Sequence, residues 1–194
     1  INENEGPRHF IDLDAYVSNP LAQLPKQWQQ AVEKYGDSTL IKHGIVPWHM
    51  VRVKYYLTQA FLNQNADQIL KISADLGHYV GDAHVPLHTT SNYNGQKTDQ
   101  RGIHGFWESR LPELFDERYD LFVGKAKYID NVNDAAWDAV ANAHLALDSV
   151  LTLEAQVSRQ ISPTKKYSFE VRGNQTVKVY SYEFSEAYHQ RLQG

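Results

Sequence analysis

The stretch from His78 to Glu108 reads HYVGDAHVPLHTTSNYNGQKTDQRGIHGFWE and contains two similar pairs, His78/Asp82 and His104/Glu108. The members of each pair are four positions apart, which on an α-helix places both side chains on one face, about one turn apart. A histidine nitrogen and a carboxylate oxygen are both ligands that suit Zn²⁺. One such pair is usually a surface pair, but two pairs within one short stretch favour a metal site over coincidence.

Pro86 interrupts the helical pattern between these two pairs, because proline lacks a backbone N–H and clashes with the preceding turn. His88 follows two positions later, so it can point back toward the site from a turn. The sequence therefore predicts a helix over 66–83, a polar loop over 89–102, and a helix that resumes at IHGFWESRL.

Composition limits the class of protein. The chain has 194 residues, of which 42% are hydrophobic, and we expect a single helical domain over 1–194. A formal net charge of −4 gives no indication of a basic surface for duplex nucleic acid. Binding of a single strand stays open, because bound metal ions could supply the local positive charge. The absence of cysteine excludes disulfides. No apolar run is long enough to predict a membrane span, and no protein partner is implied.

Apolar residues at helical spacing predict most of the remaining structure. The expected helices lie at about 25–35, 47–63 and 133–160, and a further short helix, capped by Asp37 or Ser38, ends at His43. A loop is expected between Pro20 and Pro25, and a short helix and loop over 112–131. Alternation around Gly173–Asn174 predicts a β-hairpin at 167–182. The fold class is then all-α: a multi-helix bundle with one small hairpin, whose metal ligands converge between helices.

Four other histidines carry weaker signals. His49, in a first helical turn, is interpreted as a capping or surface residue, and His144, beside an apolar stripe, as a packed one. His189 is interpreted as a surface residue. His9, in the segment RHFID, is on its own residues a histidine in a short extended piece rather than a ligand.

The order His78-x-x-x-Asp82-x-x-x-Pro86-Leu87-His88, followed by His104-x-x-x-Glu108, resembles the superfamily of zinc phospholipases C and single-strand-specific nucleases of the S-one/P-one type. RHFID around His9 is similar to the upstream ligand segment of that superfamily. The resemblance implies an all-α bundle around three zinc ions in a protein that is secreted or periplasmic.

The resemblance also assigns the ligands. One zinc ion would be held by His9, His78 and Asp82, and Asp82 would also bridge to a third ion. A second zinc ion would be held by His88, His104 and Glu108. Each of these two ions would keep room for water, as catalytic zinc does.

The chain departs from this superfamily at its start. The superfamily holds its third zinc with an N-terminal Trp and a nearby His, and an Asp that ligates zinc and acts as a base lies further upstream. INENEGPR contains none of these, so the catalytic group beyond zinc-bound water stays unassigned. We expect a fragment, truncated before residue 1 and also after Gly194, that encodes two zinc sites. It would retain metal best at the second site and would by itself be a poor catalyst.

The implied activity is hydrolysis of a small or polymeric phosphodiester by water whose pKa zinc lowers to about 7. Glu108 at the last ligand position resembles the phospholipases and slightly favours a phospholipase C. Phe10 and Asp12 resemble the base pocket of the nucleases, which makes a single-strand nuclease or nucleotidase the alternative. We slightly favour the other interpretation of these two residues, in which Phe10 belongs to the core and Asp12 orients a ligand histidine. A non-catalytic metal-binding helical domain also stays open, whereas a di-iron bundle would need several Glu ligands and Glu-x-x-His pairs.

Overall fold

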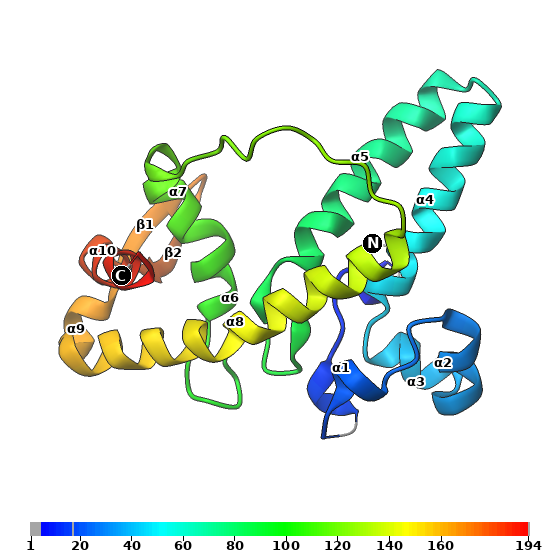
Figure 1. Ribbon diagram of the computed structural model, residues 1–194. Helices are drawn as coiled ribbons and strands as arrows, with labels where there is room; N and C mark the ends of the chain where they lie inside the picture. The colour runs from blue at the N-terminus through cyan, green and yellow to red at the C-terminus, as the bar shows by residue number, and fades with distance from the viewer. Residues whose placement is uncertain (1–4, 17, 194) are drawn as a thin grey trace. The chain divides into compact units, whose positions relative to one another are not determined.

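The computed structural model describes residues 5–16 and 18–193 and is mostly helical with one two-stranded sheet, which confirms the predicted fold class (Figure 1). The elements in chain order are η1 (Gly6–Arg8), η2 (Leu13–Ala15), α1 (Pro20–Gln23), α2 (Trp28–Tyr35), α3 (Asp37–Lys42), α4 (Val46–Leu62), α5 (Ala66–Ala83), η3 (Pro86–Thr89), α6 (Ile103–Gly105), η4 (Phe106–Arg110), α7 (Leu111–Phe115), η5 (Asp116–Arg118), α8 (Val132–Gln160), α9 (Pro163–Lys166), β1 (Tyr167–Arg172), β2 (Gln175–Tyr180) and α10 (Tyr182–Leu192).

The chain forms two compact units. Unit 1 comprises residues 1–91 and 127–147, and unit 2 comprises residues 92–126 and 148–194. Helix α8 contributes its first part to unit 1 and its last part to unit 2. The expected single domain over 1–194 stays a prediction.

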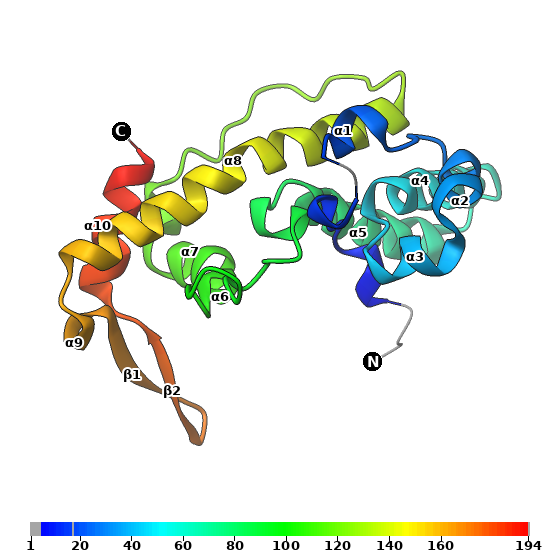
Figure 2. The same ribbon diagram turned by 90° about the horizontal axis from the view of Figure 1, so that it is seen from below.

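In unit 1, α4 and α5 run side by side as an antiparallel pair (Figures 1 and 2). Asn65 begins α5 because its side chain accepts a hydrogen bond of 3.1 Å from the backbone N–H of Gln68, as an N-cap does. The apolar face of α5 turns to the core, where Tyr79 and Ala83 are buried. His78 and Asp82 therefore fall on another face of the helix, as the sequence predicts.

The segment that carries His9 is fixed by backbone hydrogen bonds within unit 1. The Ile11 N–H donates to the His88 carbonyl at 2.9 Å, and the Ile45 N–H donates to the Pro7 carbonyl at 2.7 Å. Gly44 has a φ of 85°, and a Cβ there would overlap the Phe10 carbonyl, so the close approach requires glycine. These contacts bring the start of the described chain to the turn that carries His88.

Unit 2 is built around an aromatic core and the hairpin. The Phe106 ring lies 4.3 Å from Tyr180 and 5.0 Å from Tyr188 between ring centroids. Strands β1 and β2 pair antiparallel from Tyr167↔Tyr180 to Arg172↔Gln175, so the hairpin lies where the sequence predicts it. Figure 2 shows the hairpin extending away from α9.

Three local expectations are wrong. A short helix, α1, starts at Pro20 where a loop was expected, because proline suits the first helical turn. His49 is buried, since its neighbours Val46, Pro47, Trp48 and Met50 are buried as well and the start of α4 lies inside the unit. His189 is also buried, with its ring 4.4 Å from Phe115, because α10 packs into the core of unit 2.

Two other expectations hold. His144 is a packed histidine whose Nδ1 lies 2.9 Å from the Thr89 hydroxyl. None of the helices in the described part of the chain combines the length and the hydropathy that crossing a lipid bilayer requires.

Candidate metal site

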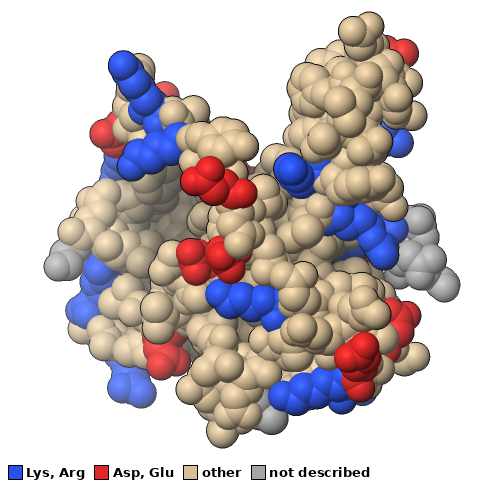
Figure 3. Space-filling view, turned by 45° about the vertical axis from the view of Figure 1, so that its right-hand side comes forward, with Lys and Arg blue, Asp and Glu red and all other residues tan. Residues whose placement is uncertain are grey.

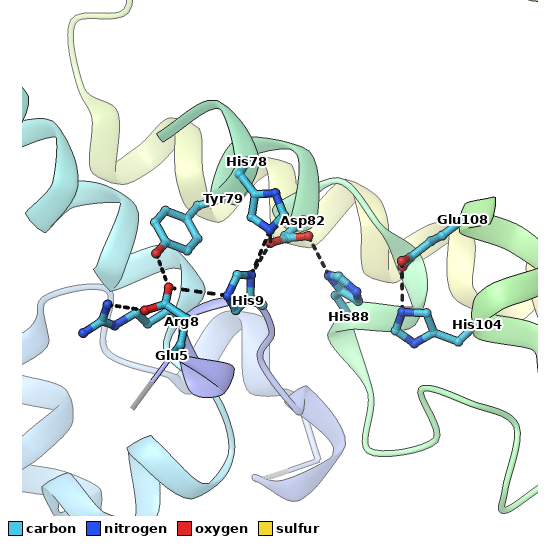
Figure 4. A network of polar contacts seen from close by, with 9 residues as sticks. All are labelled: Glu5, Arg8, His9, His78, Tyr79, Asp82, His88, His104 and Glu108. Carbon is cyan, nitrogen blue, oxygen red and sulfur yellow. Dashed lines mark hydrogen bonds and ion pairs between the residues drawn. The ribbon is translucent and has the colours of Figure 1, made fainter. Parts of the chain in front are cut away.

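Three of the predicted ligands converge in unit 1 (Figure 4). Helix α5 presents His78 and Asp82 from adjacent turns, and His9 reaches them from the end of η1. His9 Nδ1 lies 2.7 Å from Asp82 Oδ2, His78 Nε2 lies 3.2 Å from His9 Nδ1, and His78 Nε2 lies 3.3 Å from Asp82 Oδ2. We call this group the first ligand set.

The spacing of these three atoms fits a zinc ion. Ligand atoms about 2.05 Å from a tetrahedral zinc lie about 3.3 Å from one another. Two of the three separations, 3.2 and 3.3 Å, match this value, and the third, 2.7 Å, is the short contact between a histidine and a carboxylate. Two imidazoles and one carboxylate also form a donor set that zinc accepts. The residues therefore fit a metal ion, and nothing in their geometry identifies which metal.

Asp82 contacts three histidines through its two carboxylate oxygens. Its Oδ2 belongs to the first ligand set, whereas its Oδ1 lies 3.5 Å from His88 Nδ1. The Asp82 side chain is 13% exposed and that of His88 is 11% exposed, so both are shielded from water. A carboxylate that turns each oxygen to a separate nitrogen has the arrangement that a bridging ligand needs.

In unit 2, His104 and Glu108 form the second predicted pair. His104 Nε2 lies 2.9 Å from Glu108 Oε2, so the two side chains do face each other. The residues Phe106–Arg110 form a π-helical turn rather than α-helix, a feature that often occurs at functional sites.

The second predicted ligand set draws on both units. His88 lies in unit 1, and His104 and Glu108 lie in unit 2. Their joint coordination of one ion stays a prediction from the sequence.

The sequence missed a group that touches the first ligand set. Glu5 Oε1 lies 3.6 Å from His9 Nε2, the ring nitrogen that points away from Asp82 (Figure 4). The Tyr79 hydroxyl donates to Glu5 Oε1 at 2.5 Å, and Arg8 donates to Glu5 Oε2 at 2.7 Å. The spacing Glu5-x-x-x-His9 resembles that of the two predicted pairs and could have drawn attention to this residue.

These contacts change the acidities of the groups involved. The hydrogen bond from Tyr79, together with the charges of Arg8 and His9, lowers the pKa of Glu5 although its partial burial opposes this. Burial raises the pKa of Tyr79 to about 12, with help from the bond to Glu5. Glu5 is therefore an anion and Tyr79 a neutral donor at pH 7, so a negative carboxylate stands behind His9.

His49 lies beside this group. Its ring meets the Tyr79 ring edge-on at a centroid distance of 4.7 Å. Burial lowers the pKa of His49 to about 4, and the charges of Arg8 and Arg52 add to this effect. His49 is therefore neutral at pH 7.

The two predicted substrate residues sit on the same N-terminal segment. Phe10 is half-buried against the backbone of Gly44. Asp12 Oδ2 lies 3.4 Å from His43 Nδ1, so the histidine that it meets here was not predicted as a ligand. A role for either residue in binding substrate stays a prediction.

No family model matches this chain, and neither a curated protein nor a solved structure matches it.

Proposed function

We propose that this chain belongs to a zinc-dependent phosphodiester hydrolase that resembles phospholipase C. The observation that carries the proposal is the convergence of His9 with His78 and Asp82, which are 69 and 73 positions away along the chain. A surface pair at helical spacing would need no third residue from so distant a segment. Metal binding is supported by the donor set, one carboxylate and two imidazoles, and by two separations between ligand atoms that match those around a tetrahedral zinc ion.

In this proposal each residue has a limited role. His9, His78 and Asp82 would hold one ion, and by the resemblance His88, His104 and Glu108 would hold a second. Zinc bound there would act as a Lewis acid and lower the pKa of a coordinated water to about 7. Asp82 would neutralise part of the metal charge through Oδ2, while its Oδ1 faces His88. No residue is assigned as the proton acceptor.

The proposal leaves two substrate classes, phospholipids and single-stranded nucleic acids or nucleotides. Glu108 favours a phospholipase C, by its resemblance, and Phe10 with Asp12 favours a single-strand nuclease or nucleotidase. A protein that binds metal through the same residues without hydrolysing a substrate is a candidate of another class. Secretion or a periplasmic location is implied by the resemblance alone.

One experiment separates these candidates. Zinc content and hydrolysis of phosphatidylcholine and of single-stranded DNA are measured side by side, on residues 1–194 and on any longer form of the protein. We expect His78→Ala to lower zinc content and to abolish hydrolysis. The matched control is His84→Ala, because His84 is an exposed histidine at the end of the same helix.

The possible results are distinct. Normal zinc content in the His78→Ala variant would contradict the metal site. Zinc binding without hydrolysis in every form of the protein would favour the non-catalytic domain. Preference for one of the two substrates would assign the class.

A further inference from the structure

Unit 2 contains a cavity of about 410 Å³ between the hairpin and the helical stretch α6–η4–α7. Phe106 and Ser109 line it on the helical side, and Val177, Val179 and Tyr180 line it on the hairpin side. The volume lies within the usual range for small-molecule sites and exceeds what one phosphate group requires. All of its lining residues belong to unit 2. We call it the hairpin pocket.

Two arginines of the hairpin pocket are already neutralised. Arg110, with a side chain only 11% exposed, pairs with Glu170 at 2.7 Å and donates to the Tyr180 carbonyl at 3.1 Å. Arg172 makes a two-pronged contact with Glu113 at 2.7 and 3.1 Å. These pairs fix both guanidinium groups in the wall, and each retains N–H groups beyond those used.

Two further cations of the pocket have no such compensation. Arg101 and Lys178 line the cavity and are exposed, and neither forms an ion pair with another described residue. Lys178 Nζ lies 3.7 Å above the Tyr167 ring, which holds the ammonium group at the pocket without cancelling its charge. The two Arg–Glu pairs are neutral, so the hairpin pocket carries a net charge of about +2.

The hairpin pocket is separate from the residues predicted to bind metal. His104 and Glu108 occupy one face of the stretch α6–η4, and the pocket is lined instead by Gly105, Phe106, Ser109 and Arg110 of the same stretch. A ligand can therefore bind in the pocket without contacting His104 or Glu108.

We propose that the hairpin pocket binds a phosphate group carried by a nucleotide-sized anion. Guanidinium and ammonium groups are the usual protein partners of phosphate, and the volume leaves room for a sugar or base beside it. A zwitterionic phosphocholine has no net negative charge, so a pocket with two uncompensated cations attracts it less strongly than a phosphate monoester dianion. The face drawn in Figure 3 carries basic and acidic side chains intermixed, with no broad basic surface on that face.

The proposal goes beyond the proposed function, because none of the residues that line the hairpin pocket is a predicted metal ligand and binding there does not depend on which substrate the metal site takes. Binding is measured with a chelator present, so that zinc contributes nothing. The probes are thymidine monophosphate, a short single-stranded oligothymidylate, inorganic phosphate and glycerophosphocholine, followed by calorimetry.

We expect the monophosphate or the oligothymidylate to bind better than glycerophosphocholine. The double variant Arg101→Gln/Lys178→Gln should weaken this binding about tenfold or more, because hydrogen bonds to charged groups are lost. The control variant Arg159→Gln/Lys165→Gln removes the same charge from unit 2 outside the pocket and should change binding little. Circular dichroism of each variant verifies that it is folded.

Tighter binding of the strand than of the monophosphate would assign the pocket to single strands, and the reverse would assign it to free nucleotides. Equal weakening by both double variants would show non-specific attraction and overturn the proposal, as would undetectable binding of every probe or a preference for glycerophosphocholine. His78→Ala should leave this binding unchanged, so loss of hydrolysis and loss of pocket binding are separate failures.

Discussion

Replacing Glu5 by Gln tests how the first ligand set is held in place. The change keeps the shape of the side chain and removes its charge. Glu5 Oε1 lies 3.6 Å from His9 Nε2, whereas His9 Nδ1 faces the metal position. Histidines that bind metal usually present their second nitrogen to a carboxylate or carbonyl, which fixes the ring and raises its basicity.

The expected size of the effect follows from the contact distance. Loss of such an orienting group typically costs 10- to 100-fold in metal affinity, as a rough guide. The contact of 3.6 Å is longer than a hydrogen bond, so we expect the lower end. Zinc affinity should fall about tenfold, which corresponds to about 1.4 kcal/mol.

The assay is a zinc titration against a chromophoric competitor at pH 7.5. Glu5 has a lowered pKa, so its charge is fully present at this pH and is lost only as the pH falls through that lowered pKa. Glu33→Gln is the matched control, because Glu33 is an exposed glutamate on α2 in the same unit. The reasoning fails if Glu5→Gln binds zinc as tightly as the unaltered protein while His78→Ala loses it.

Three further predictions concern stability. Removing zinc with a chelator should lower the melting temperature, since metal binding to a ligand set is coupled to folding; an unchanged melting curve would contradict this. Lys166→Met should cost about 3 kcal/mol in urea unfolding, because Lys166 Nζ lies 2.8 Å from the 1% exposed Glu154. Among the described residues, its loss leaves the buried carboxylate without a cation, with only the hydrogen bonds from Gln100 and Ser158. Lys165→Met, which breaks only an exposed pair, should cost less than about 1 kcal/mol, and equal costs would refute the role of burial. The pKa of His49 is lowered to about 4 in the folded state, so its unfolded form binds a proton first as the pH falls below about 6.5. The free energy of unfolding of the metal-free protein should therefore decline from pH 6.5 to pH 4. The charged groups that face His49 are Glu5, Arg8, His9 and Arg52. His49→Gln should flatten this decline, and an equal decline in the variant would refute the role of His49.

Much of the local structure follows from the sequence. The stripe of apolar residues in 66–83 predicts α5, and Asn65 caps it; the same stripe places His78 and Asp82 on a different face. The alternation around Gly173–Asn174 predicts a hairpin with its turn at the glycine, whose φ is 61°. These features depend on interactions between residues close in the chain, which one short window of sequence contains.

Burial of individual histidines could not be predicted in this way. His49 and His189 occupy positions that a helical wheel leaves ambiguous, and neighbouring elements decide their exposure. α4 starts inside unit 1, and α10 packs against Phe115. No local pattern records which element will cover a given helix face.

The sequence by itself determined the helical class, the hairpin and the pairing of His78 with Asp82 and of His104 with Glu108, because helical and strand periodicity are local properties. The tertiary structure decided that His9 meets His78 and Asp82, that Asp82 turns its other oxygen to His88, and that Glu5 stands behind His9. The contacts of His9 with His78 and Asp82 join segments about seventy residues apart, and they depend on how the apolar faces pack, for which the chain carries no short-range signal. The other two contacts are between residues close in the chain, and there the tertiary structure decides the orientation of the side chains.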